Sequence, residues 1–262
     1  MKKIIISVII IAKNEAAMIG DCLQSAAWAD ELILVDNGST DQTVEFARRH
    51  GARVLAMPTP KPAFSQLRNL GLEKARGHWL LYLDADERIT PELKKEVRKV
   101  ISQKLSAKSY QPKTVVYEIP RRNFYLGQEV HYGGAWPDYV KRLFFKNTLQ
   151  RWERDLHEDP VFAGQMGTLR APLVHLAHRD LSSMIAKTSE WSQIEANLLF
   201  QSGHPPVTWW RLLRPMLTEF WQRGVVKQGW RDGPIGWIEV IFQAFSRFIT
   251  YARLWEMQQK KL

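Results

Sequence analysis

Residues 78–87 read His78-Trp79-Leu80-Leu81-Tyr82-Leu83-Asp84-Ala85-Asp86-Glu87, an apolar run that ends in carboxylates. A short, uninterrupted apolar run of this kind is typical of a strand that is buried on both faces of a parallel sheet. Two carboxylates separated by one residue at the end of such a strand can share a divalent cation. The alternative is that they only end the strand before a helix, whose start Thr90 and Pro91 predict.

The residues before this run alternate in the same way. Short apolar runs at residues 5–11, 32–36 and 53–56 predict three more strands. A helix start follows the second of them at Ser39-Thr40-Asp41-Gln42. Alternating strands and helices predict an α/β fold built on a parallel sheet.

Polar clusters follow three of the predicted strands. They are Lys13-Asn14-Glu15, Asp36-Asn37-Gly38-Ser39 and Asp84-Ala85-Asp86-Glu87. Because ligands of open parallel sheets bind at the carboxyl ends of the strands, we expect the three clusters to line one site.

The second half of the chain changes in character. Residues 115–122 and 138–145 read as strands, and from about residue 178 the chain becomes helical and rich in Trp and Arg. Seven of the eleven Trp residues lie at or after Trp191. We therefore predict a catalytic domain over residues 1–177 and a helical extension over residues 178–262.

Composition restricts the setting. The single cysteine, Cys22, permits no intrachain disulfide and favours a reducing, cytoplasmic environment. The apolar run at residues 4–12 is rich in β-branched Ile and is interpreted as a buried strand rather than a signal peptide. The net charge of +10 favours polyanionic partners. No run reaches the roughly 18 apolar residues of a membrane span, so any membrane contact should be peripheral.

The order and spacing of four segments resemble family 2 glycosyltransferases. The segments are Ser7-Val8-Ile9-Ile10-Ile11-Ala12-Lys13-Asn14-Glu15, Val35-Asp36-Asn37-Gly38-Ser39-Thr40-Asp41, Arg68-Asn69-x-Gly71 and Ala75-x-Gly77-x-Trp79-x-Leu81-x-Leu83-Asp84-Ala85-Asp86-Glu87. The likeness is closest to the branch that contains lipopolysaccharide core glucosyltransferases. It implies a GT-A fold, which is a Rossmann-like mixed sheet flanked by helices, a nucleotide-diphosphate sugar donor, and inversion at the anomeric carbon.

The resemblance also implies how the donor is bound. Asp36 looks like the carboxylate that contacts the nucleoside, with Asn14 and Glu15 lining the same pocket. Arg68 resembles the family arginine near the nucleotide, where its permanent charge suits a diphosphate, although a surface role is also open on physical grounds.

The Asp-x-Asp pair is the predicted metal site. Asp86 is the first choice as ligand of a magnesium or manganese ion, and Asp84 assists through the ribose or a metal-bound water. A divalent cation would stabilise the charge that develops on the departing diphosphate.

An inverting transferase also needs a base for the acceptor hydroxyl. The family branch carries a His-Glu pair where this chain has His157-Glu158, so Glu158 is the predicted base. Other family members use the Asp of a Glu-Asp pair, which Asp159 also satisfies. A solvated acidic turn before Pro160 is the non-catalytic alternative.

The remaining predictions concern the acceptor and the membrane. We group Trp136 and Arg142, from two motifs of the same branch, with residues that face the acceptor or the membrane. Residues 209–231 interleave Trp with cations, a pattern suited to an anionic lipid surface on the inner face of the cytoplasmic membrane. The cations singled out there are Arg211, Arg214, Arg223 and Lys227.

Two further features have structural interpretations. A helical stripe of Ile238, Phe242, Phe245 and Ile249 is expected to pack inside the protein. His175 and His178 are expected to be structural or to contact the acceptor, because no third zinc ligand is evident.

Together these features predict transfer of a sugar, for which the family suggests glucose from UDP-glucose, to a glycolipid such as the lipopolysaccharide inner core. A transferase that acts on a polyprenyl phosphate carrier is the first alternative, although it would usually bring a hydrophobic membrane domain. A basic nucleic-acid-binding protein is the second. We expect no nucleic-acid partner, because the acidic clusters would repel phosphates unless a metal intervened.

Overall fold

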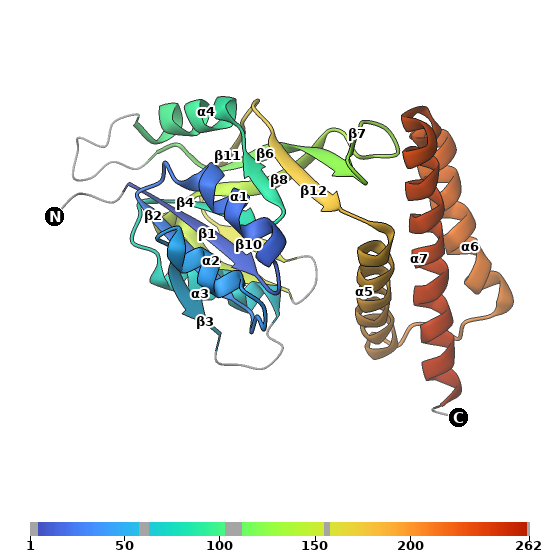
Figure 1. The fold of residues 1–262 in the computed structure, drawn as a ribbon. Helices are drawn as coiled ribbons and strands as arrows, with labels where there is room; N and C mark the ends of the chain where they lie inside the picture. Colours follow the sequence, from blue (N-terminus) through green and yellow to red (C-terminus); the bar gives the residue numbers. More distant parts are fainter. Residues whose placement is uncertain (1–4, 58–62, 103–111, 155–157, 261–262) are drawn as a thin grey trace. The chain divides into compact units, whose positions relative to one another are not determined.

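The computed structural model describes residues 5–57, 63–102, 112–154 and 158–260. The chain divides into two compact units, which are drawn together in Figure 1. The first unit comprises Met1–Arg121 and Tyr139–His175, and the second comprises Arg122–Asp138 and Leu176–Leu262.

The first unit alternates strands and helices, as the sequence predicts. Its helices are α1 (Ala16–Ala26), α2 (Thr43–Arg49), α3 (Phe64–Lys74), α4 (Pro91–Ser102) and the short 3₁₀ helix η1 (Lys146–Thr148). Its strands are β1 (Ile6–Ala12), β2 (Glu31–Asp36), β3 (Arg53–Ala56), β4 (Trp79–Asp84), β5 (Glu87–Ile89), β8 (Asp138–Phe145), β9 (Leu149–Glu153), β10 (Asp159–Phe162) and β11 (Gln165–Thr168). Strands β6 (Thr114–Tyr125) and β12 (Leu173–His178) begin in this unit and end in the second.

The main sheet is mixed. Its strand order is β3-β2-β1-β4-β8-β6-β12-β5, and β9 and β10 form a separate two-stranded sheet. Strands β1 to β4 are parallel, whereas β8 runs antiparallel to β4 and β12 antiparallel to β5. The expected mixed sheet flanked by helices is therefore confirmed.

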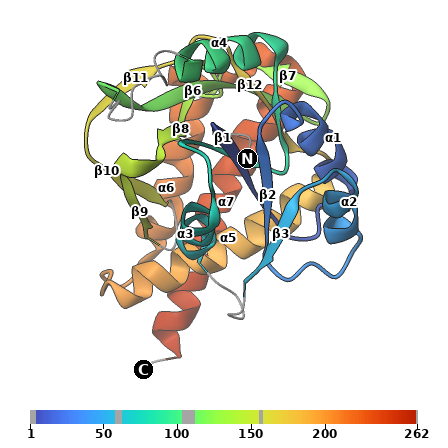
Figure 2. The same ribbon diagram turned by 90° about the vertical axis from the view of Figure 1, so that its left-hand side faces the viewer.

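Close packing explains two glycines of the quoted motifs. Helices α1 and α2 lie side by side, and α3 packs against β1 and β2 (Figure 2). A side chain at Gly71 of α3 would lie 2.5 Å from Ile9 of β1, and one at Gly77 would lie 2.5 Å from the backbone nitrogen of Ser7. Both separations are well below van der Waals contact, so only glycine allows this approach.

The second unit is mainly helical. It contains α5 (Leu181–Gln201), α6 (Trp209–Phe220), η2 (Trp221–Val226), η3 (Gly229–Asp232), α7 (Gly233–Gln259) and the short strand β7 (Gln128–Val130). Helices α5 and α6 both pack on α7. Within residues 5–57, 63–102, 112–154 and 158–260, no helix is both long and apolar enough to cross a bilayer.

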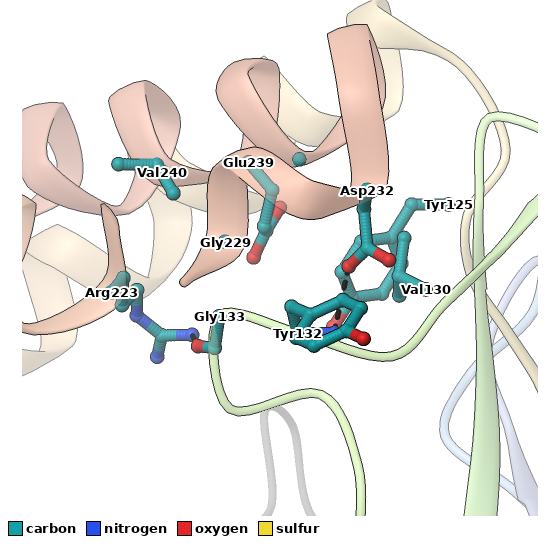
Figure 3. Close-up of a pocket in the computed structure, with 10 residues that line it drawn as sticks. Tyr125, Val130, Tyr132, Gly133, Arg223, Gly229, Asp232, Glu239 and Val240 are labelled. Atoms are coloured by element: carbon teal, nitrogen blue, oxygen red, sulfur yellow. Dashed lines mark hydrogen bonds between the residues drawn. The ribbon is translucent and has the colours of Figure 1, made fainter. Parts of the chain in front are cut away.

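A small cavity in this unit is lined by residues of strands, loops and helices (Figure 3). Asp232 accepts hydrogen bonds from the backbone nitrogens of His131 and Tyr132, and Arg223 donates to the carbonyl of Gly133 (3.2 Å). Burial raises the pKa of Glu239, which also lines the cavity. The volume of about 10 Å³ suits one water molecule rather than a substrate.

The apolar stripe of α7 that was expected to pack inside the protein is only partly buried. Ile238, Phe242 and Ile249 are partly buried, but Phe245 remains 48% exposed. Its neighbour on α7, Ile241, is 55% exposed. The α7 helix therefore keeps an apolar face in contact with solvent, which the stripe alone did not predict.

Candidate functional site

The three polar clusters meet because of strand register. Strand β1 lies between β2 and β4, with Ala12 paired to Asp36 on one side and Ile11 paired to Asp84 on the other. The strands are parallel, so their carboxyl ends fall at the same edge of the sheet. The structure thus brings the three clusters together.

The loops after β1 and β2 are tied to each other. Asp36 is 7% exposed and accepts hydrogen bonds from the backbone nitrogens of Gly38 and Ser39, at 3.2 Å each. Asn14 has a φ of 55° and accepts a hydrogen bond from the backbone nitrogen of Thr40 (2.8 Å). Its own backbone nitrogen donates to the Ser39 hydroxyl (3.0 Å). These contacts fix the positions of two of the predicted nucleotide-binding residues, Asn14 and Asp36.

Glu15 and Asp41 extend the same link between the loops. The backbone nitrogen of Glu15 donates to the Thr43 hydroxyl (2.8 Å), and Asp41 accepts from the backbone nitrogen of Ala16 (3.0 Å). Slight burial raises the pKa of Asp41, but hydrogen bonds from Thr43 and Ala16 outweigh it and lower the pKa overall. Asp41 therefore has a structural role at the start of α1.

Asp84 lies in a network of buried charges. Its Oδ2 pairs with Arg142, whose Nη2 also pairs with Glu87 (2.6 Å), a side chain with no exposed surface. Arg121 reaches Glu87 from β6 (3.3 Å). Burial raises the pKa of Asp84, but the charges of Arg142 and Arg68 outweigh it and hold the pKa well below its ordinary value. Asp84 is thus an anion that two arginines stabilise.

Arg142 is consequently not where the sequence analysis expected it. We grouped it with acceptor or membrane contacts, but it is 4% exposed and bridges Asp84 and Glu87. Strand β8 pairs with β4 and places this guanidinium among the carboxylates at the end of β4. Its position therefore corrects the expectation of a surface contact. Glu87, which belongs to the predicted cluster after β4 but was given no role of its own, shares the network.

We expect Arg142→Lys to lower the free energy of unfolding by about 2 kcal/mol, because one ammonium cannot reproduce the planar guanidinium that bridges two carboxylates. The measurement is the urea midpoint followed by circular dichroism. Arg151→Lys is the matched control, since Arg151 is exposed and pairs with the also exposed Glu153 two residues along β9. Equal midpoints for the two variants would contradict a bridging role.

Arg68 connects this network to the predicted base. Its Nη2 lies 3.2 Å from Asp84 Oδ1 and 2.6 Å from Glu158 Oε1, and its Nε donates to the same oxygen of Glu158 (2.7 Å). Its guanidinium stacks on the rings of Trp152 (4.9 Å) and Tyr82 (5.6 Å). With a side chain only 6% exposed, Arg68 has no surface role.

Asn69, the next residue, explains how this contact is built. Its side chain donates to the carbonyl of Trp152 (2.9 Å) and accepts from the Trp152 backbone nitrogen (2.8 Å). Helix α3 is thereby tied to β9, which pairs with β10. The Arg68-Asn69 pair thus brings together α3, the Asp84 network and Glu158.

The two candidate bases have different surroundings. Glu158 is 16% exposed and faces Arg68, whereas Asp159 is 49% exposed and pairs with Lys141 (2.8 Å). His157, the other half of the predicted His-Glu pair, lies outside the described residues.

Asp86 approaches a residue that the sequence analysis did not assign to the metal. Its Oδ2 lies 3.7 Å from His175 Nε2 on β12. Two ligands that each lie about 2.1 Å from one ion are at most about 4.2 Å apart, so this pair fits a shared cation. Asp84 fits less well as a direct ligand, because both of its carboxylate oxygens face arginines, whose positive charge would repel a metal ion. Among the described side chains, no group of three or more His, Cys, Asp or Glu is placed to hold a metal ion.

The predicted acceptor and membrane residues lie mainly in the second unit. Trp136 is 41% exposed, and Arg211, Arg214 and Lys227 are also exposed. Arg223 is only partly exposed and pairs with Glu219 (2.5 Å). Since it also binds the Gly133 carbonyl, Arg223 has a structural role that its position in a basic stretch did not reveal.

Known proteins provide the comparison. Residues 7–172 match the family model described as glycosyl transferase family 2. The chain is 26% identical to the lipopolysaccharide core biosynthesis glycosyltransferase LpsC of Rhizobium meliloti (strain 1021), over 99% of this chain and 95% of that protein. It is 28% identical to an uncharacterized glycosyltransferase of Rickettsia typhi (strain ATCC VR-144 / Wilmington), over 99% of this chain and 89% of that protein.

Solved structures give weaker matches. Glucosyl-3-phosphoglycerate synthase from Mycobacterium tuberculosis, in complex with Mn²⁺, UDP and glucosyl-3-phosphoglycerate, aligns with a TM-score of 0.46 and 20% identity over 77% of this chain and 81% of that chain. S. aureus TarS 1–349 in complex with UDP aligns with a TM-score of 0.45 and 14% identity over 98% and 92% of the two chains. The family match confirms the predicted glycosyltransferase, and the sheet confirms its GT-A architecture. Because the family model spans more than half of its residues, this chain belongs to glycosyl transferase family 2.

Proposed function

We propose that this glycosyltransferase uses a divalent cation to transfer a sugar, with inversion, from a nucleotide diphosphate to a glycolipid held at an anionic membrane surface. We assign the donor as UDP-glucose and the acceptor as the lipopolysaccharide inner core. The observation that carries the proposal is the meeting of Asp36, Asp84 and Asp86 at one edge of the sheet, with Glu158 linked to Asp84 through Arg68.

The donor site is assigned from the strand ends. Asp36, with Asn14 and Glu15 on the neighbouring loop, is assigned to the nucleoside, since buried carboxylates of this kind accept hydrogen bonds from ribose or base. Arg68 is assigned to the diphosphate, because a guanidinium presents several donors in a fixed plane.

Asp86 and His175 are assigned to the cation, whose chemistry would be to neutralise the charge of the departing diphosphate. A carboxylate and an imidazole are only two ligands, and alone they do not select between magnesium and manganese. The donor diphosphate would therefore have to complete the coordination.

Glu158 is assigned as the base that accepts the proton of the acceptor hydroxyl. Its carboxylate lies beside Arg68 and thus close to the end of β4, whereas Asp159 is held by Lys141. The proposal keeps Asp159 as the alternative base.

Donor binding tests the proposal directly. The chain is mixed with a panel of nucleoside diphosphate sugars, with and without Mn²⁺, and its melting temperature is followed, because a ligand that binds the native state raises it. We expect UDP-glucose to stabilise the wild type in Mn²⁺ and Asp36→Ala to need a higher concentration for the same shift. No stabilisation by any sugar nucleotide would refute the proposal.

Binding to the membrane is assigned to α6, η2 and η3. Trp209, Trp210, Trp221 and Trp230 are each more than half exposed, which is unusual for so large an apolar side chain. Amphipathic aromatic rings among cations suit the boundary between headgroups and acyl chains. The relative LpsC is named for lipopolysaccharide core biosynthesis, which is compatible with such an acceptor.

Replacing Arg211, Arg214 and Lys227 together with Gln should weaken binding to anionic liposomes by about a hundredfold, since each cation near such a surface contributes about 1 kcal/mol. Arg223 is left intact because it is part of the packing. Liposome co-sedimentation at low and high salt measures the effect, and transfer to a soluble acceptor fragment should not change.

The matched control removes the same charge from the first unit by replacing the exposed residues Arg48, Lys95 and Lys99 with Gln. If both triple variants lose liposome affinity equally, only the net charge matters and the assignment of the membrane site fails.

A further inference from the structure

The contact between Arg68 and Glu158 uses the donors that a diphosphate would need. Both Nε and Nη2 of Arg68 reach Glu158 Oε1, at 2.7 and 2.6 Å. Nη2 is also shared with Asp84, and Nη1 is buried without a hydrogen-bond partner in the described structure. A diphosphate that engages the same edge of the guanidinium would therefore compete with Glu158.

The two carboxylates beside Arg68 are not equally fixed. Asp84 is held on its other oxygen by Arg142, which is itself anchored by the buried Glu87. In the part of the chain that the structure describes, Glu158 has no ion-pair partner other than Arg68. Glu158 is thus the partner that can leave, whereas Asp84 is held in place.

A buried guanidinium explains why Glu158 sits there. Removing the partner of a buried charge is strongly destabilising, so Arg68 needs anions around it whether or not a donor is bound. Glu158 supplies one of these anions. It is also the residue proposed above as the base that accepts the proton of the acceptor hydroxyl. Oε1 of Glu158 accepts a hydrogen bond from Nε of Arg68 and lies at ion-pair distance from Nη2, so this oxygen is held against the guanidinium.

We propose that the Arg68–Glu158 ion pair is a contact of the donor-free state that the donor opens. The diphosphate of the donor takes the place of Glu158 on Arg68, and the released carboxylate turns to the acceptor. The acceptor oxygen then forms its bond to the anomeric carbon, its proton passes to Glu158, and the bond from that carbon to the diphosphate breaks, with the electron pair leaving on the diphosphate. Base and donor are thereby coupled, because binding of the donor decides whether the carboxylate of Glu158 is held by Arg68 or is free to turn to the acceptor. This inference rests on the proposed roles of Arg68 and Glu158.

The test is the affinity for UDP, measured by calorimetry in Mn²⁺ and again without added metal, because it needs no turnover. Glu158→Gln removes the charge that competes for Arg68, so UDP should bind about fivefold or more tightly, within the usual range of coupling between two sites. Glu153→Gln removes one carboxylate from the adjoining strand β9 and should leave UDP affinity unchanged. Glu158→Asp keeps the charge but shortens the reach to Arg68, and serves as the second variant if the Gln variant does not fold.

A double-mutant comparison separates exchange on Arg68 from simple charge repulsion. In an Arg68→Gln background, Glu158→Gln should no longer raise UDP affinity if the two anions compete for Arg68. A gain that persists there would show that Glu158 merely repels the phosphates, and would overturn the proposal. Unchanged or weaker UDP binding by Glu158→Gln in the wild-type background would overturn it as well. A wild-type chain that binds no nucleoside diphosphate would instead refute the proposed function, and this inference with it.

Discussion

Asp86→Asn is expected to reduce sugar transfer by about a thousandfold or more while the chain remains folded. The reason is that a cation bound at this site would stabilise the leaving diphosphate by several kcal/mol. Asp86 is suited to this test because its side chain is partly exposed and lies outside the apolar core. The substitution keeps the size of the side chain and removes its charge. Transfer is measured as the initial rate of nucleoside diphosphate release at saturating metal.

A second readout follows the metal itself. Binding of Mn²⁺ in the presence of UDP, measured by electron paramagnetic resonance, should weaken in Asp86→Asn and, to a smaller extent, in His175→Gln. Asp21→Asn is the control, since Asp21 is 80% exposed on α1. A folded Asp86→Asn chain with near-normal transfer at saturating metal would remove Asp86 from the mechanism, and normal Mn²⁺ binding by His175→Gln would remove His175 from the site.

Glu158→Gln should slow transfer by roughly a hundredfold or more, the range expected when a general base is lost. Donor binding should not weaken, because Gln keeps the shape of the side chain and Arg68 keeps Asp84 as a partner. Single-turnover rates with preformed donor complex measure the chemical step apart from binding.

The neighbouring carboxylate provides the comparison. Asp159→Asn should be mild, since Asp159 is half exposed and pairs with Lys141 rather than with the Arg68 network. If Asp159→Asn is instead the slower variant, the base lies one residue further along the chain. Two mild variants would exclude this motif from proton transfer.

The sequence by itself determined the α/β architecture and the edge of the sheet where the site lies. Runs such as Ile6–Ala12 and Trp79–Asp84 are apolar except for Ser7 and the terminal Asp84, and such strands are stable only inside a covered sheet. Parallel strands then force the polar residues that follow them to one edge, so Asp36 and Asp84 could be predicted to meet without knowledge of any contact.

Only the tertiary structure decided which charges pair. Arg142 and Glu158 lie 58 and 74 residues from Asp84, and they come together because β8 runs antiparallel to β4 and because Asn69 ties α3 to β9. The period of apolar residues carries no information on which strand lies next to which, so an arginine between apolar neighbours looks the same whether it faces water or a buried carboxylate. Burial of a charge without a partner is costly, so each buried charge needs a partner that only the tertiary structure can supply. It is the tertiary structure that makes Arg142 structural, pairs Arg68 with Glu158, and places His175 opposite Asp86.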